Sequence, residues 1–335
     1  MSTGKQFFTY KEQIKELQSK GIGCSEDDIE LLVKHGYFNL VNGYREPFFN
    51  GRDQNGNRLY LIGTTLQQIS LVKEFDDQLR SLLLKSISHV EEELRTVSAY
   101  CFDYYNTKGA VPWHDKNAYR VGYDRQDYSK VVTAIYKDLI YSHSEYVQYY
   151  WTQYADFPGW IVFKNINLST FINLMKLAKE DVNYAICDLY GIANAAGNNR
   201  YKILLGSLHW LRIVRNNCAH NERVYCLRPQ GGKTASLRIV EQYFSQMKKS
   251  YRATNTPKCI MDLLVYLKYY YSPEEFEQLI DQIKELLYDL KGSILPDAFE
   301  KVRADMGIKD LVDLNTLVKL NKKPIDYTTM ANMLS

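Results

Sequence analysis

One short stretch, residues 215–220, carries side chains whose chemistry can be combined: Arg215, Asn216 and His220. A histidine titrates near neutrality, so it can accept and return protons at cellular pH. The guanidinium of Arg215 is always charged, and its planar fork matches the oxygens of a phosphate. Asn216, one helical turn before His220, can hydrogen-bond the imidazole or contact a substrate. Together these residue types predict acid–base chemistry at a phosphate group.

The same stretch has no cluster of carboxylates to hold magnesium, so the groups suit a metal-free reaction. Such a reaction is the attack of a ribose 2′-hydroxyl on its own phosphodiester, which gives a 2′,3′-cyclic phosphate and a 5′-hydroxyl. We expect His220 to take the hydroxyl proton or to protonate the leaving oxygen, and Arg215 to balance charge on phosphorus. The alternative is structural: Arg215, Asn216 and His220 form a buried polar network between helices.

Other polar side chains near this stretch are candidates for RNA binding. Arg212 and Arg223 can contact phosphates. His209 lies three helical turns before His220, on roughly the same face, and can line an RNA groove. A solvated helix face explains the two arginines about as well, and a histidine in such a place is more often half-buried.

Aromatic and acidic runs elsewhere allow two further hypotheses. The tyrosine-rich runs at 146–154 and 269–271 can stack unpaired bases, but their helical spacing predicts that most of these rings lie in the core. Glu91–Glu93 could in principle bind a metal. We expect instead a helix face in which these carboxylates pair with Arg95.

The composition excludes several classes of protein. The chain has 335 residues with a formal net charge of +3; 45% are hydrophobic and 24% charged, which excludes a largely disordered chain. A charge this small means that any basic surface must arise from local arrangement. No run approaches the roughly 18 apolar residues of a membrane span, and the polar start lacks the features of a signal peptide. We therefore expect a cytoplasmic protein without membrane contact.

Neither a cofactor nor a metal is expected. Phosphate-cradling motifs such as the Walker loop and GxGxxG are absent, as is the spacing typical of zinc proteases. The six cysteines are scattered and are expected to be reduced. Cys218, His220 and Cys226 could form part of a zinc site, but no fourth ligand has a suitable spacing.

These candidate residues belong to a chain with strong helical periodicity. Apolar residues recur at steps of three and four from Thr64 or Thr65 to about Phe102, which predicts a helix of more than thirty residues. Two apolar runs around Asn55-Gly56, within 46–63, predict a β-hairpin. Residues 106–128 are an irregular insertion.

The remaining pattern predicts an all-α bundle with an embedded hairpin. The first 45 residues are expected to form short helices, with Ser25 as an N-cap and Ile29, Leu32 and Val33 facing inward. Further helices are expected at 129–142, 167–178, 180–190, 198–219, 235–251, 258–270 and 273–290. We divide the chain into an N-terminal part with the hairpin, a main helical domain and a C-terminal helical tail, at 1–64, 65–292 and 293–335.

Several motifs resemble known families. Arg215-Asn216-Asn217-Cys218-Ala219-His220 resembles the RNxxxH motif of HEPN domains, which are all-α modules. The chain is also similar to the bacterial Abi family of AbiD/AbiF-type abortive-infection proteins. That likeness rests on residues 36–45, Glu92–Arg95 with Ala99-Tyr100, residues 158–162 and the 215–220 motif, in order over roughly residues 8 to 228.

The resemblance implies phage defence by metal-independent cleavage of RNA, with the main domain HEPN-like. Arg215 and His220 would be catalytic, with Asn216 as their support. HEPN nucleases usually pair two motifs across a dimer; this chain has one copy, so RNA and a second copy are the expected partners. Some HEPN toxins carry a regulatory tyrosine two residues after the histidine, where this chain has Glu222. The alternatives are a non-catalytic protein that binds a structured noncoding RNA, and a protein-binding regulator.

Overall fold

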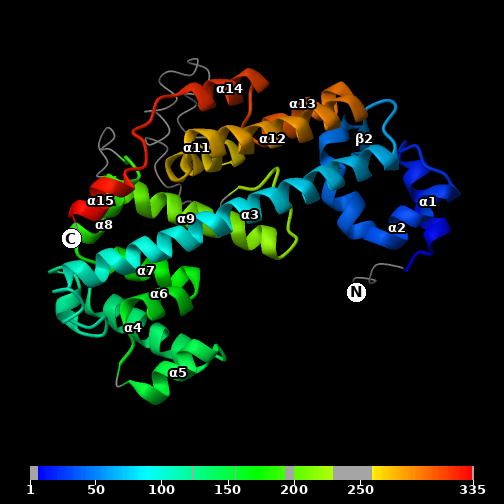
Figure 1. The fold of residues 1–335 in the computed structure, drawn as a ribbon. Coiled ribbons are helices and arrows are strands. Elements are labelled where there is room, and N and C mark those ends of the chain that lie inside the picture. The colour runs from blue at the N-terminus through cyan, green and yellow to red at the C-terminus, as the bar shows by residue number, and fades with distance from the viewer. Residues whose placement is uncertain (1–6, 123, 155, 193–199, 229–258, 334–335) are drawn as a thin grey trace.

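A computed structural model describes residues 7–122, 124–154, 156–192, 200–228 and 259–333 of the chain. Within these ranges the chain is predominantly helical, and its strands form one short antiparallel pair (Figure 1). The prediction of an all-α fold with a small β-hairpin is therefore confirmed. The expected helix at 235–251 lies outside the described residues.

The longest element is helix α3 (Leu66–Tyr105), which runs across the molecule in Figure 1. Its 40 residues span about 60 Å. The side chain of Thr65 caps it by accepting a hydrogen bond from the backbone N–H of Gln68. Neither α3 nor any other described helix is long and apolar enough to cross a bilayer. Its apolar stripe packs against α6 (Gly159–Asn165), α8 (Glu180–Leu189), α9 (Arg200–Ala219) and α12 (Pro273–Ser293).

Short elements surround the N-terminal end of α3 (Figure 1). Ser25 caps the first of two consecutive helical turns, as predicted, by accepting a hydrogen bond from the backbone N–H of Asp27. The prediction that Val33 faces inward is wrong. Within residues 29–35 the side chain of Leu32 is buried, whereas that of Val33 is exposed. The elements are α1 (Tyr10–Ser19), η1 (Glu26–Asp28), α2 (Ile29–His35), η2 (Phe38–Asn42), η3 (Glu46–Phe48), β1 (Phe49–Arg52) and β2 (Arg58–Tyr60).

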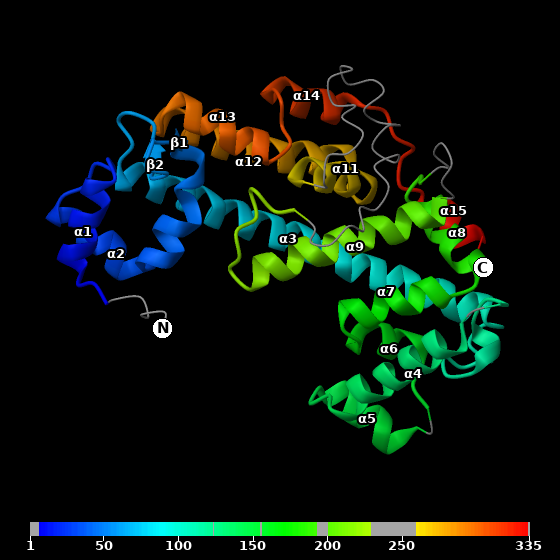
Figure 2. The same cartoon turned by 180° about the vertical axis from the view of Figure 1, so that it is seen from behind.

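Smaller helices gather at the other end of α3 (Figure 2). They are η4 (Lys116–Ala118), α4 (Arg125–Ile140), α5 (Glu145–Gln153) and α7 (Leu168–Leu177), together with α6 and α8. Helix α4 begins four residues earlier than predicted, because Asp124 caps it through the backbone N–H of Gln126. The sequence pattern did not predict α5 and α6, since both are short and Pro158-Gly159 interrupts their periodicity.

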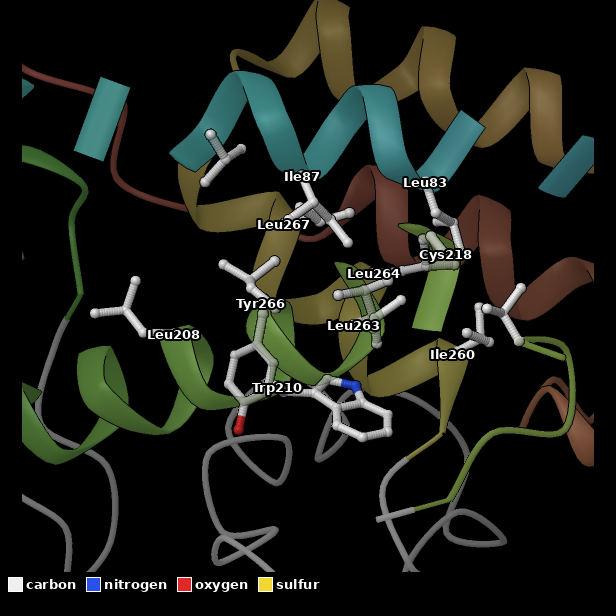
Figure 3. Close-up of a cluster of buried hydrophobic side chains, with 14 of the residues drawn as sticks. Leu83, Ile87, Leu208, Trp210, Cys218, Ile260, Leu263, Leu264, Tyr266 and Leu267 are labelled. Atoms are coloured by element: carbon white, nitrogen blue, oxygen red, sulfur yellow. The ribbon is translucent and has the colours of Figure 1, made fainter. Parts of the chain in front are cut away.

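The core of the main helical region lies between α3, α9 and α11 (Ile260–Tyr270) (Figure 3). Every residue of α11 is buried, so this helix is covered on all sides. The indole N–H of Trp210 donates a hydrogen bond to the backbone oxygen of Cys259 at 3.1 Å, and the hydroxyls of Ser207 and Tyr270 bond each other. These contacts hold α9 in a fixed position. Side chains labelled in the cluster include Leu83, Ile87, Leu208, Leu263, Leu264 and Leu267.

The C-terminal segment returns along the molecule in three helices: α13 (Pro296–Asp305), α14 (Leu311–Lys319) and α15 (Tyr327–Met333). They pack against η3, α12 and α8 respectively. Phe299 and Leu317 are buried in these contacts. The tail thereby contributes to the core beside α12 and reaches both ends of α3.

Candidate active site at the end of helix α9

Helix α9 ends directly before His220, and the local sequence explains why. Asn221 has a left-handed φ of 57°, a conformation that asparagine tolerates better than most residues. Its backbone N–H donates to the oxygen of Cys218, and the N–H of Glu222 donates to the oxygen of Asn217. These two bonds define a Schellman motif, the usual way to close a helix. His220 is therefore held at the helix end, with its side chain exposed.

A buried carboxylate, Asp76 of α3, fastens the chain that follows α9. It accepts hydrogen bonds from the backbone N–H groups of Val224 and Tyr225, at 3.1 and 2.8 Å. The Tyr44 hydroxyl and the Arg80 guanidinium donate to the same carboxylate, each at 2.9 Å. Because Asp76 has no exposed surface, these donors replace its lost hydration. The network fixes the segment after the helix and, through it, the end of α9.

Arg215 extends from α9 toward α3, where Glu91 holds it. Its Nε lies 3.6 Å from Oε2 of Glu91, an ion pair too long to be a hydrogen bond. Glu91 is only 14% exposed, whereas the side chain of Arg215 is 40% exposed. The guanidinium is thus anchored on one side and open to solvent on the other.

The anchor for Arg215 is itself part of a larger contact. Glu91 accepts two hydrogen bonds from Arg95, at 3.0 and 2.7 Å, which confirms the predicted pair for this carboxylate, whereas Glu93 accepts from the hydroxyls of Tyr190 and Tyr327. Arg95 also donates to the backbone oxygens of Phe163 and Ile166, at 2.7 and 2.8 Å, and so satisfies the end of α6. Glu91 therefore connects Arg215 to α3 and α6 at once.

Asn216 orients the guanidinium rather than the imidazole in this structure. Its side-chain oxygen accepts a hydrogen bond from Nη1 of Arg215 at 3.4 Å. Arg212, one turn earlier, donates to the hydroxyl of Ser169 at 3.2 Å. The buried-network alternative does not describe the whole motif, because the side chain of His220 is exposed.

The other candidate RNA-binding residues lie along α9 and in the segment just after it. His209 is exposed, so the half-buried alternative for this histidine is wrong. Arg223 is exposed too, but its Nη1 donates to the backbone oxygen of Gly43 at 2.6 Å and links the chain after α9 to the N-terminal elements. Arg223 therefore has a structural role, because it joins two parts of the chain. His209 and Arg212 lie within α9.

A cavity of about 1420 Å³ opens beside Arg215. Its walls come from α3, the connection after α3, the end of α5, and α6. Arg215 is the one residue of the 215–220 motif in its lining; Asn216 and His220 lie outside it. Arg215 is therefore the residue that the cavity and the motif have in common.

Asp103 and Gly159 form one wall of this cavity. The backbone N–H of Gly159 donates to the Asp103 carboxylate, and a side chain at position 159 would collide with that carboxylate. This close approach explains why the Pro158-Gly159 pair carries glycine. Burial raises the pKa of Asp103 to about 6.

No metal site is evident near the motif. Among the residues that the structure describes, no group of three or more His, Cys, Asp or Glu side chains could hold an ion. Cys218, considered above as a zinc ligand, is buried, and burial raises its pKa to about 12.

Sequence reasoning missed two residues that position the site. It did not connect Glu91 with Arg215, and it did not single out Asp76. A signal for Asp76 existed, because this residue lies four positions after Val72 and three before Leu79, in phase with the buried stripe of α3. A carboxylate in that phase indicates a buried polar contact.

The fold and the site define an all-α protein with an arginine–histidine motif at a helix end, next to a large cavity. A family model described as "Abi-like protein" matches residues 30–226, which is more than half of the chain. The chain therefore belongs to the Abi-like family. The matched range contains Glu91, all the residues that line the cavity and the 215–220 motif. No curated protein and no solved structure gave a significant match.

Proposed function

We propose that this protein is a metal-independent endoribonuclease of phage defence. Membership of the Abi-like family supports a role in abortive infection. Residues 36–45 and 158–162 favour the AbiD/AbiF type, and residues 215–220 have the RNxxxH form of a HEPN motif. The observation that carries the nuclease activity is the position of Arg215, anchored by Glu91 yet open at the cavity.

The reaction that suits these groups is a transesterification within RNA. The 2′-oxygen of a ribose bonds to the adjacent phosphorus while the bond from phosphorus to the 5′-oxygen breaks. A base takes the 2′-hydroxyl proton, and an acid gives a proton to the leaving 5′-oxygen. His220 acts as one of these two groups. Arg215 neutralises the extra charge on the phosphoryl oxygens, and Glu91 holds its guanidinium in place.

A second copy of the chain supplies the remaining acid–base group. One chain brings one motif and therefore one histidine to a reaction that uses both a base and an acid. A twofold dimer places the same surface patch of each subunit opposite itself. The exposed side chain of His220, at the end of α9, suits such a composite site. The proposed enzyme is a homodimer.

The test is an RNA-cleavage assay in EDTA with analysis of the product ends. We expect 2′,3′-cyclic phosphate and 5′-hydroxyl ends from the wild type, and at least a 100-fold loss of rate in Arg215→Ala and in His220→Ala. His143→Ala is the matched control, because His143 is also exposed but lies between α4 and α5, outside the cavity lining. Folding of each variant is checked by circular dichroism. Full activity of both folded variants would contradict the proposal.

One observation favours the second candidate, a non-catalytic protein that binds a structured noncoding RNA. Among the described residues, the imidazole of His220 has no hydrogen-bond partner to orient it for proton transfer. That candidate predicts RNA of defined length that copurifies with the protein. It also predicts no turnover in the assay above, with the protein dimeric and folded.

A further inference from the structure

Three aromatic side chains line the cavity beside Arg215 while remaining largely exposed. Tyr100 of α3, Tyr154 after α5 and Trp160 of α6 are 54, 55 and 57% exposed. The expectation that the 146–154 run lies mostly in the core is wrong, because three of its five aromatic rings are exposed and α5 packs mainly through Val147; the 269–271 run is buried, as predicted. Exposed aromatic rings gathered at one concave surface indicate a binding site.

Two lysines add positive charge to the same walls. The Nζ of Lys164 lies 4.8 Å from the centroid of the Tyr146 ring, and the Nζ of Lys108 lies 5.8 Å from that of Tyr104. Both lysines are exposed and line the cavity. Such contacts orient an ammonium group without neutralising it, so both charges stay available to an anion.

The acidic side chains of the lining are mostly engaged by protein groups. Glu91 is paired with two arginines and Asp103 with a backbone N–H, as described above. Asp156 lies 2.8 Å from Nε2 of His114. Glu92 is exposed and faces the same space. The formal charges of the lining therefore cancel, four carboxylates against Arg95, Arg215, Lys108 and Lys164, and the positive charge offered to a phosphate is local, at the two exposed ammonium groups.

The backbone that carries Lys108 is strained. Thr107 and Lys108 have left-handed φ values of 59° and 51°, and Gly109 follows with 83°. A left-handed conformation is unfavourable for a residue that carries a side chain. Unusual backbone of this kind concentrates at ligand-binding sites, where it directs a side chain. Here the turn directly after α3 sets Lys108 at the cavity.

We infer that this cavity binds unpaired nucleotides of an RNA strand. Bases stack on Trp160, Tyr100 and Tyr154, and phosphates contact Lys108 and Lys164. Aromatic stacking of this kind is available only to bases outside a duplex, so the cavity selects single-stranded segments. Its volume exceeds the roughly 300–1,000 Å³ of a small-molecule pocket, which favours several nucleotides over one.

What would follow from RNA binding in this cavity, cleavage of the bound strand, rests on the proposed function. Because Arg215 belongs both to the cavity lining and to the 215–220 motif, a strand in the cavity brings a phosphodiester to the guanidinium. The binding step itself needs no cleavage. It can therefore be measured in the full-length His220→Ala variant.

The experiment measures the anisotropy of a fluorescein-labelled single-stranded RNA 12-mer, whose integrity is checked on a gel. In the His220→Ala background we expect Trp160→Ala and Tyr100→Ala each to weaken binding roughly tenfold. Trp160→Phe should restore most of the affinity, because it restores an aromatic face. Tyr288→Ala is the control, since Tyr288 on α12 is also 54% exposed but lies outside the cavity.

A second measurement tests the phosphate contacts. Lys164→Ala should reduce the salt dependence of binding. Lys291→Ala should leave the salt dependence unchanged, because Lys291 is exposed on α12, outside the cavity.

Two competitors identify the form of the ligand. A fully paired RNA hairpin and a mixture of the four 5′-mononucleotides should each displace the 12-mer poorly. Equal competition by the hairpin, equal competition by the mononucleotides, or unchanged affinity of the folded Trp160→Ala and Tyr100→Ala variants overturns the inference. If the wild type cleaves no RNA while the aromatic variants lose binding, the inference stands and the proposed nuclease fails.

Discussion

At the scale of single residues, a carboxylate in the core shapes the site more than any residue at the surface. Asp76 lies on α3, yet two of its hydrogen bonds go to backbone N–H groups about 150 positions later in the chain, in the segment after His220. A buried carboxylate with four donors stabilises one arrangement and disfavours all others. The position of the helix end that carries His220 therefore depends on Asp76.

We predict that Asp76→Ala lowers the free energy of unfolding by about 3–5 kcal/mol, because two backbone N–H groups and the Tyr44 hydroxyl lose their common buried acceptor and Arg80 is left with Asp77 alone. Tyr44→Phe removes one neutral donor from the same carboxylate and should cost about 1 kcal/mol. Urea unfolding of both variants checks the prediction. Equal losses in the two variants would show that the charge of Asp76 matters no more than a single hydrogen bond.

At the scale of elements, α11 is unusual because a lysine lies within a fully buried helix. Lys268 is 4% exposed, and its Nζ donates to the backbone oxygen of Val318 at 2.9 Å. Burial lowers the pKa of Lys268 to about 8. Lys322 of the tail has a pKa lowered to about 8, first by burial and then by the like charge of Lys268. The contact between α11 and the C-terminal tail therefore carries an electrostatic penalty at neutral pH.

This penalty has a defined dependence on pH. The unfolded chain holds the Lys268 proton up to about pH 10.4, whereas the folded chain releases it near pH 8. Between these values the unfolded state binds more protons, so this lysine makes the free energy of unfolding rise with pH. Above pH 10 the buried tyrosines act oppositely, because burial raises the pKa of side chains such as Tyr44.

We therefore predict that Lys268→Met raises the free energy of unfolding by about 1–2 kcal/mol at pH 7, and that the gain shrinks by pH 9.5. Urea unfolding at pH 7, 8.5 and 9.5 measures it. Lys291→Met, on the exposed face of α12, is the control and should differ from the wild type equally at each pH. A Lys268→Met protein that is less stable than the wild type at every pH contradicts the penalty.

At the scale of the whole molecule, the long helix α3 serves as a common support. Glu91 and Asp76 extend from it to Arg215 and to the segment after His220, and Tyr100 and Asp103 extend from it into the cavity. The motif, its anchors and the cavity thus share one rigid element. The proposed reaction uses a second acid–base group, and our proposal assigns it to another copy of the chain.

The proposed homodimer leads to a prediction about concentration. If the site is composite, cleavage activity per chain should fall as the protein is diluted through its dimer dissociation constant. Mass measurement by light scattering over the same range gives the dimer fraction, which the activity should follow. Constant activity per chain in samples that are demonstrably monomeric would exclude a composite site, and the reaction would then need its acid and base from one chain.

The sequence alone was sufficient wherever the physical cause is local. The length and start of α3 follow from an apolar stripe and the Thr65 cap, and the hairpin follows from its Asn-Gly turn. The end of α9 also lies where the sequence places it. The Arg215–His220 motif was visible as a set of residue types at helical spacing; in the structure Arg215 and Asn216 are hydrogen-bonded, whereas His220 lies just after the end of α9. The division at residues 64 and 292 stays a prediction.

Only the tertiary structure decided features that depend on distant segments. Whether Tyr154 and Trp160 are exposed depends on what packs against α5 and α6, which no periodicity records. The pair between Glu91 and Arg215 joins residues more than 120 positions apart. The cavity exists because α3, α5 and α6 fail to fill the space between them. Local patterns set the elements and their faces, but the packing of those faces is a property of the whole chain.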